Sequence, residues 1–348
     1  MDRIFIAEYN YDKSWIIGKL ADDMVTYLSK MGFSCRVGQL EDYDGEEIVY
    51  HLNYHKARPI KEAKHNSVFY THAVNLNYEM DLEQCKGQFD SYICMSPEDA
   101  QFLIELGFNP DKVYGRTLPI RNAYVKPLTI GIFSACYSYY TVKNEDWIVE
   151  YCQQNPKAKY IDWVFVGAGW NKITPDLEKL NCSFEWYNIS RDLPFEYRFQ
   201  QEKLAYLNYY IYMGMDGGAM GTYDAYAMDV PLCVTYDGFH KSIPDIDFTF
   251  DDKQSFFNQI DKILDKHLRR LDFFNTHTPE NYAKWILSVW QGAKPEPLSD
   301  RDKKCINFTS VAEKKRTQYY TMNVRGILKA ISRMLLKRKE KKYTPKEK

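Results

Sequence analysis

Short apolar runs alternate with longer amphipathic segments along most of this chain, and this alternation limits the possible folds more than any other feature. In the first third, strand-like runs occupy residues 4–9, 35–40, 47–53, 66–73 and 91–96, and helical patterns occupy residues 14–32 and 97–107. Apolar strands that are separated by helices are typical of a parallel sheet covered on both faces. The sequence therefore predicts a doubly wound α/β fold.

The same pattern starts again near residue 128. Strands are predicted at 128–135, 161–169, 184–188 and 231–237, helices at 146–156, 222–229, 251–274 and 280–292, and a helix leading into a strand at 195–216. We expect three parts: an N-terminal Rossmann-like domain (1–122), a second Rossmann-like domain (123–300) and a C-terminal tail (301–348). Two such domains that face one another form a cleft, which suits an enzyme with two substrates.

Composition narrows the class of protein. Of the 348 residues, 45% are hydrophobic and 27% are charged, which excludes a disordered chain, a collagen-like repeat and a polytopic membrane protein. The N-terminal residues lack the apolar core of a signal peptide, and no apolar run is long enough to span a bilayer. The eight cysteines are scattered without metal-binding spacing, so we expect buried, reduced thiols in a cytoplasmic protein.

Residues 213–240 carry the clearest chemical signal. An apolar strand runs into Asp216, Gly217 and Gly218, a helix follows from about Gly221, and Asp224 lies in the first turns of that helix. Free N–H groups and the positive end of the helix dipole favour an anion such as a diphosphate at this position. Glycines allow the backbone to approach the phosphates closely. A carboxylate on the same helix can accept hydrogen bonds from ribose hydroxyls.

This segment resembles the signature of GT-B glycosyltransferases of the retaining, nucleotide-sugar-dependent family four. In that signature two acidic residues, separated by seven positions, lie in a run like E-G-x-G-x-x-x-x-E-A-x-A-x-G-x-P. Here Asp216 and Asp224 have this spacing, and Ala225, Ala227 and Pro231 fall in register. Both acidic residues are Asp rather than Glu, and Asp229 replaces a usual glycine.

The resemblance implies a role for each matched residue. Asp216 would contact the transferred sugar, and Asp224 would hold the ribose. The diphosphate would lie on the turn formed by the backbone of Gly217, Gly218, Ala219 and Met220. An ordinary strand–turn–helix with solvated acids is the alternative interpretation of the same residues.

Two further positions match the resemblance. His72 follows a strand of the first domain, where family members often place a histidine that faces the donor; a histidine that only bonds to backbone is the alternative. Lys143 is the match for a lysine that neutralises the leaving diphosphate, because charge neutralisation of this kind replaces a metal in the family. The arginine expected near Ser134 is missing, and Arg116 or Arg121 could supply its charge, although a solvated surface role fits them equally.

The remaining signals concern the nucleobase and metals. Residues 182–188 occupy the place where the nucleobase usually docks in the family. Asp245 and Asp247 form a D-x-D pair, but in a loop that is typical of solvated acids. We therefore expect a nucleotide-diphospho-sugar as co-substrate, and no cofactor or metal ion.

The last 48 residues differ from the rest of the chain. They hold 16 Lys and Arg against 4 Asp and Glu, whereas residues 1–300 hold 30 against 43. Residues 322–342 have the spacing of a basic amphipathic helix, which favours an anionic membrane surface. A helix that packs on the N-terminal domain, followed by a solvated basic end, is the alternative.

Taken with the resemblance, these features predict a glycosyltransferase that transfers a sugar from a nucleotide-diphospho-sugar to a glycan or lipid-linked acceptor, with retention. The expected context is lipopolysaccharide or capsule biosynthesis at the cytoplasmic face of the membrane, with no nucleic-acid partner. Two alternatives stay open: a nucleotide-sugar 2-epimerase of similar build, and a glycan- or nucleotide-binding protein without catalysis.

Overall fold

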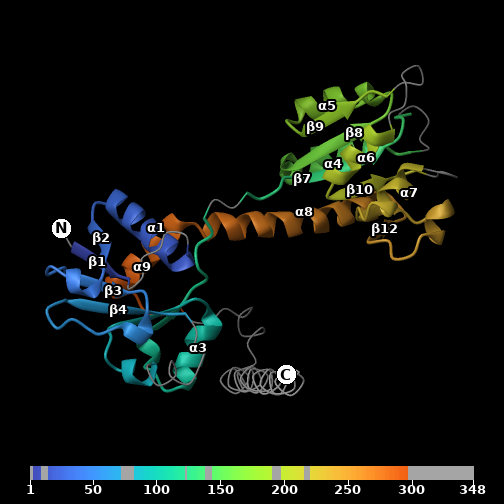
Figure 1. Cartoon of the computed structure of the whole chain (residues 1–348). Coiled ribbons are helices and arrows are strands. Elements are labelled where there is room, and N and C mark those ends of the chain that lie inside the picture. The colour runs from blue at the N-terminus through green and yellow to red at the C-terminus, as the bar shows by residue number, and fades with distance from the viewer. Residues whose placement is uncertain are drawn as a thin grey trace, which may run out of the picture. The chain divides into compact units, whose positions relative to one another are not determined.

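The computed structural model describes residues 3–8, 15–71, 82–121, 124–137, 143–189, 197–214 and 220–296. Its chain divides into two compact units (Figure 1). The first unit contains the described residues up to Arg121 together with those from Thr276 onward, and the second contains residues 124–275.

The first unit is built on a six-stranded parallel sheet in the order β2-β1-β3-β4-β5-β6. Its strands are β1 (Arg3–Ala7), β2 (Ser34–Gly38), β3 (Ile48–His51), β4 (His65–Tyr70), β5 (Ser91–Cys94) and β6 (Val113–Gly115). β-Branched and aromatic residues dominate them, as strands buried on both faces require. The strand order reverses between β1 and β3, which makes this pair the switch point of the sheet.

Alternate residues of β4 show that both faces of this sheet are covered. Phe69 packs into one cluster with Ile4 and Ile48, whereas Val68 and Tyr70 pack into another on the opposite face. Helix α1 (Ile16–Lys30) contributes Leu20 and other apolar residues to the first cluster, and helix α3 (Pro97–Glu105) contributes to the second. The doubly wound architecture predicted for this unit is therefore present.

Helix α9 (Pro279–Trp290) differs from the sequence prediction in where it packs. The domain boundaries 123–300 placed it with the second domain, but the structure places it in the first unit. Its residues Tyr282, Ile286 and Trp290 pack into the same cluster as α1 and β1. The apolar stripe of α9 needs a sheet face to cover, and β1, β3 and β4 offer one on the side of α1.

The second unit also has a six-stranded parallel sheet, in the order β12-β11-β10-β7-β8-β9. Its strands are β7 (Leu128–Phe133), β8 (Ile161–Val166), β9 (Ser183–Tyr187), β10 (Tyr209–Tyr212), β11 (Leu232–Thr235) and β12 (Phe248–Phe250). Numbered from β7, this is the strand order 3-2-1-4-5-6 of dinucleotide-binding folds read from the opposite edge.

The helices of the second unit complete the doubly wound fold. They are α4 (Asp146–Gln154), α5 (Thr174–Lys179), α6 (Tyr197–Tyr206), α7 (Met220–Ala227) and α8 (Lys253–Thr276), whose last residue belongs to the first unit. One apolar cluster joins all of these helices to the sheet, and the fully buried Trp163 and Trp170 are its largest side chains.

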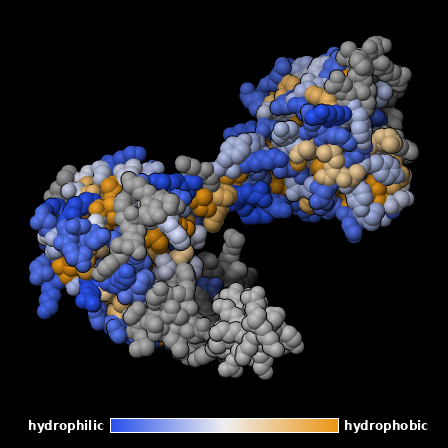
Figure 2. Space-filling model, in the orientation of Figure 1, coloured by the Kyte–Doolittle hydropathy of each residue, from blue (hydrophilic) through white to orange (hydrophobic). Residues whose placement is uncertain are grey.

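The surface and the cysteines of the described residues have the character expected from the sequence. Hydrophilic residues cover most of the described surface on the face shown in Figure 2. The seven described cysteines carry free thiols, and all of them except the half-buried Cys35 are buried, as predicted. None of the described helices combines the length and the apolar character that a transmembrane span requires.

Candidate functional site

The switch point of the second sheet lies between β7 and β10. From β7 the chain proceeds through β8 and β9 to one edge, then returns to place β10 on the other side of β7. Loops that leave two such strands diverge, and the crevice at their carboxyl ends is where open α/β sheets bind ligands. In this unit the crevice lies at the ends of β7 and β10, near Ser134 and Met213.

Helix α7 begins at this crevice because Gly221 lets it approach β7 closely. A Cβ atom at Gly221 would lie 2.9 Å from the carbonyl oxygen of Phe133 and 2.9 Å from the hydroxyl oxygen of Tyr210. Only a residue without a side chain fits against both strands at this distance. The first turn of α7, with its free backbone N–H groups, is therefore placed beside the carboxyl end of β7.

Asp224 is held in position by helix α6. Its carboxylate accepts a hydrogen bond of 2.6 Å from the Tyr197 hydroxyl and one of 3.4 Å from the amide nitrogen of Gln200. The carboxylate raises the pKa of Tyr197, since it accepts a hydrogen bond from the protonated phenol and would repel the phenolate. Asp224 is half-buried, and a carboxylate offers about four acceptor positions, so it can also accept hydrogen bonds from a ligand hydroxyl.

Lys143 lies beside the ends of β7 and β10. Its Nζ atom is 5.1 Å from the ring centroid of Tyr137, which follows β7, and 5.7 Å from that of Tyr212, at the end of β10. The two rings hold the ammonium group at the switch point through cation–π contacts. The neighbouring Asn144 donates a hydrogen bond of 2.8 Å to the Met213 carbonyl, which ties this segment to the end of β10.

A buried histidine that the sequence did not single out links the chain segments that flank residues 215–219. His240 is 1% exposed, and its Nδ1 lies 2.8 Å from the Thr235 carbonyl oxygen and its Nε2 3.5 Å from the Thr222 hydroxyl. The Thr235 hydroxyl donates a hydrogen bond of 2.9 Å to the Gly214 carbonyl. This chain of contacts links Gly214 to Thr222 in α7. A lone histidine after a strand gives no specific signal in a sequence.

The loop after β8 packs against the other side of β7. A Cβ atom at Gly167 would lie 2.4 Å from the Ser134 carbonyl oxygen, and one at Gly169 would lie 2.5 Å from that of Cys136. The indole of Trp170 donates a hydrogen bond of 2.8 Å to the same Ser134 carbonyl. The glycines of this loop thus shape the wall of the crevice.

The structure describes only part of the predicted site. Three predicted positions are described: Lys143 contacts the rings of Tyr137 and Tyr212, Asp224 is hydrogen-bonded to α6, and Met220 begins α7 with a largely exposed side chain. The other predicted positions lie outside the described residues: His72, Asp216, Gly217, Gly218 and Ala219.

Other candidate residues have local partners in the fold. Arg121 binds Asp23 at 2.7 Å and Asp22 at 3.5 Å, and Arg116 stacks over the Trp285 ring at 5.4 Å. Asp247 accepts a hydrogen bond of 3.0 Å from the Leu232 backbone, which fixes the loop before β12 to the start of β11. Within the described residues, no group of three or more metal-binding side chains converges.

Comparisons with known proteins address the fold. No protein-family model and no curated protein matches the sequence. Among solved structures, the apo form of the lipopolysaccharide outer core galactosyltransferase WaaB matches 84% of this chain and 100% of its own, with 12% identity and a TM-score of 0.34. HepE from Anabaena in complex with UDP and glucose matches 92% and 100%, with 10% identity and a TM-score of 0.31. The catalytic domain of cholesterol-α-glucosyltransferase from Helicobacter pylori matches 47% and 99%, with 16% identity and a TM-score of 0.34.

Two of these structural neighbours are glycosyltransferases, and HepE binds UDP and glucose, but likenesses at this level of identity assign no activity to the present chain. The fold itself is established by the two sheets. Each unit is a parallel, doubly wound α/β domain, so the two Rossmann-like domains that the sequence predicted are present.

Proposed function

We propose that this chain is a glycosyltransferase that transfers a sugar from a nucleotide-diphospho-sugar to a glycan or lipid-linked acceptor in the biosynthesis of a surface polysaccharide. One observation supports the proposal: the N-terminus of α7, the helix that carries Asp224, packs against β7 and β10, and Lys143 contacts the rings of Tyr137 and Tyr212 at the ends of the same two strands. A helix N-terminus and an ammonium group bind a diphosphate, and a carboxylate on the same helix binds ribose hydroxyls.

In this proposal each residue acts at a distinct stage. The backbone N–H groups of the turn before α7 hold the diphosphate, and Asp224 orients the nucleoside. As the bond between the anomeric carbon of the sugar and the diphosphate breaks, negative charge grows on the leaving diphosphate. The Lys143 ammonium stabilises that charge. The resemblance further assigns Asp216 and His72 to contacts with the transferred sugar, and it implies retention, with the leaving phosphate accepting the acceptor proton.

A donor panel tests the activity. The full chain is incubated with UDP-, GDP-, ADP-, dTDP- and CMP-sugars, with and without a membrane extract as a source of acceptor, and released nucleotide is measured. Release that depends on the acceptor supports the transferase and excludes the 2-epimerase. If no donor raises the melting temperature or releases nucleotide, the chain is not a nucleotide-sugar enzyme.

A pair of variants tests the site. Asp224→Asn keeps the size of the side chain but removes its charge, so nucleotide binding should weaken about tenfold to a hundredfold, the typical worth of a hydrogen bond to a charged group. Asp265→Asn removes one charge from an exposed position on α8 of the same unit and should leave the dissociation constant unchanged. Equal dissociation constants for both variants, measured by calorimetry, would remove Asp224 from the donor site.

We also propose that the basic residues of 301–348 hold the enzyme at an anionic membrane. The support is the charge of this segment and the amphipathic spacing of 322–342. Co-sedimentation of the full chain and of residues 1–320 with anionic vesicles tests this, since equal binding of both would exclude a membrane role for the tail.

A further inference from the structure

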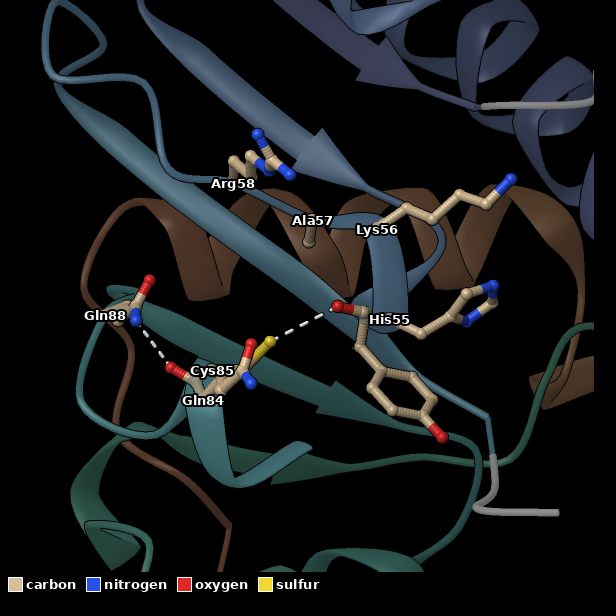
Figure 3. Close-up of a pocket in the computed structure, with 8 residues that line it drawn as sticks. His55, Lys56, Ala57, Arg58, Gln84, Cys85 and Gln88 are labelled. Atoms are coloured by element: carbon tan, nitrogen blue, oxygen red, sulfur yellow. Dashed lines mark hydrogen bonds between the residues drawn. The ribbon is translucent and has the colours of Figure 1, made fainter. Parts of the chain in front are cut away.

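A pocket in the first unit has a lining of one charge sign. It has a volume of about 600 Å³ and lies between the chain segment that follows β3 and the segment that precedes β5 (Figure 3). We call residues 54–58 the strap and this cavity the strap pocket. The strap contributes His55, Lys56 and Arg58, and the opposite wall contributes Gln84, Cys85 and Gln88. Among the residues that the structure describes, no carboxylate lines the pocket.

The walls of the strap pocket are fixed by buried contacts. Tyr54 is 2% exposed, and its ring centroid lies 5.3 Å from that of Tyr70 in the core. The Cys85 thiol donates a hydrogen bond of 3.2 Å to the Tyr54 carbonyl across the pocket floor, and Tyr92 donates one of 2.8 Å to the Cys85 carbonyl. Because both walls are fixed to the sheet, the pocket exists before a ligand binds. Binding therefore costs little conformational entropy of the protein.

The cationic side chains are exposed at the mouth of this fixed pocket. Figure 3 shows Lys56 and Arg58 extending from the strap, with Gln84, Cys85 and Gln88 on the opposite wall. Among the described residues, Arg58 has no ion-pair partner. A guanidinium presents a planar fork of donors that matches the oxygens of a phosphate, and an ammonium adds a second full charge. Two permanent cations and a histidine match a phosphate dianion better than a carboxylate, which carries one charge.

One wall of the pocket begins at the edge where open sheets bind ligands, whereas the other wall precedes the amino end of β5. The strap follows the carboxyl end of β3, and β3 and β1 form the switch point of the first sheet. From this placement and its charge, we propose that the strap pocket binds a phosphoryl group and that Lys56 and Arg58 are its principal contacts. Resting on the proposed function, the inference extends to the acceptor: the phosphoryl group belongs to a phosphorylated glycan that receives the sugar.

The binding test uses inorganic phosphate and the full chain. Phosphate is titrated calorimetrically at constant ionic strength, into wild type and into two double variants. Lys56→Gln with Arg58→Gln should weaken phosphate binding about tenfold or more, because two charge-assisted contacts are lost. Lys61→Gln with Lys64→Gln removes the same charge from the same connection outside the pocket lining, and should leave the dissociation constant within about twofold. Far-UV circular dichroism and melting temperatures confirm that both variants fold.

A further arm separates the strap pocket from the donor site, which also attracts phosphate. Lys143→Gln should not change phosphate binding at the strap pocket. If Lys143→Gln abolishes binding and the Lys56/Arg58 variant does not, the ion occupies the donor site and the proposal is wrong. Equal weakening by the two double variants would show a long-range charge effect and would equally overturn it.

The acceptor assignment has its own readout. With acceptors that differ only by a phosphoryl group, the Lys56/Arg58 variant should raise the KM for the phosphorylated acceptor about tenfold or more, with a smaller effect on kcat. An unchanged KM would refute the acceptor assignment. Absence of donor turnover in wild type would instead refute the proposed function, while the phosphate titration would still decide whether the pocket is an anion site.

Discussion

Gly221 shows how a single residue places a helix at the candidate site. Its Cα faces the backbone of Phe133 and the hydroxyl of Tyr210 so closely that an added Cβ would lie 2.9 Å from each. Replacing a helical glycine by alanine usually stabilises a protein by about 0.5–1 kcal/mol, since alanine restricts the unfolded chain. At this position a clash with backbone opposes that gain, and overpacking typically costs about 1–3 kcal/mol.

We therefore predict that Gly221→Ala lowers the free energy of unfolding by about 1–2 kcal/mol, because the steric cost exceeds the gain in propensity. The displaced α7 should also weaken nucleotide binding. Chemical denaturation and a nucleotide titration measure the two effects. A variant more stable than wild type would contradict the close approach of α7 to β7.

His51, at the end of β3, illustrates a cost of burial that depends on pH. It is 1% exposed, and burial lowers its pKa to about 4, a shift that contact with Asn66 only partly opposes. In the unfolded chain the imidazole has an ordinary pKa near 6.5. Between these two values the unfolded chain binds a proton that the folded protein does not, so stability decreases as the pH falls.

From this difference we predict that the unfolding free energy of wild type falls between pH 7 and pH 5 by about 2 kcal/mol more than that of His51→Phe. Urea denaturation at pH 7, 6 and 5 measures both slopes. The comparison uses the change with pH and not the absolute stability, so a variant that packs less well remains informative. Parallel pH dependences would show that His51 titrates normally in the folded protein.

At the scale of elements, helix α9 completes the hydrophobic core of the first unit. Its apolar residues Tyr282, Ile286 and Trp290 cover the sheet beside α1, and the Tyr50 ring contacts Trp290 edge-on with centroids 5.6 Å apart. The polar side of the same helix carries the pair Lys284 and Glu280 at the surface. The buried face of α9 should therefore contribute much more to the stability of the first unit than its exposed face.

We predict that Ile286→Ala destabilises the first unit by about 2–5 kcal/mol, the usual cost of a buried cavity of this size. Lys284→Ala, two positions away, should cost less than about 0.5 kcal/mol, since it removes only an exposed i,i+4 pair. Denaturation monitored by tryptophan fluorescence distinguishes the two. Similar small losses for both variants would show that α9 does not contribute to the core of the first unit.

The sequence predicts the presence of long helices and strands well. It predicts short strands poorly, and it does not predict which elements pack against one another. Strands such as β8 and helices such as α8 carry enough periodic residues to be recognised. By contrast, β6 and β12 have three residues each and therefore show no period. The stripe of α9 predicts a helix but not its packing partner, because an amphipathic face fits any apolar surface.

The candidate site divides in the same way. Local patterns and a family resemblance single out Asp224 and Lys143, and their roles in a donor site stay predictions, as does that of the Gly-rich segment, which lies outside the described residues. The contacts of His240 with Thr222 and Thr235 could not be predicted, since they depend on three segments that meet only in the folded unit. The strap pocket could not be predicted either, because its two walls, residues 54–58 and 84–88, lie far apart along the chain.

For the whole molecule, the two units differ in continuity. The second unit consists of one uninterrupted stretch, 123–275, whereas the first combines the N-terminal residues with the chain from Thr276 onward. A continuous unit with its own core can fold by itself, whereas a unit that lacks a core helix exposes the apolar surface that the helix should cover.

We predict that residues 123–275, produced alone, unfold cooperatively and bind nucleotide, whereas residues 1–122 alone are insoluble or lack a cooperative transition. Adding a peptide of residues 276–296 should restore a cooperative transition to residues 1–122. Circular dichroism melts and calorimetry measure these outcomes. A cooperative melt of residues 1–122 without the peptide would show that α9 is dispensable for the first unit.

The return of the chain to its first unit also sets an order for events on the ribosome. Domains commonly fold in the order in which they are synthesised, N-terminal first. Here the sheet of the first unit emerges early but waits for α9, which is translated only after all of 123–275. The second unit can therefore fold before the first. Until Trp290 has been synthesised, the first unit exposes the apolar surface that α9 will cover, and chaperones can bind that surface.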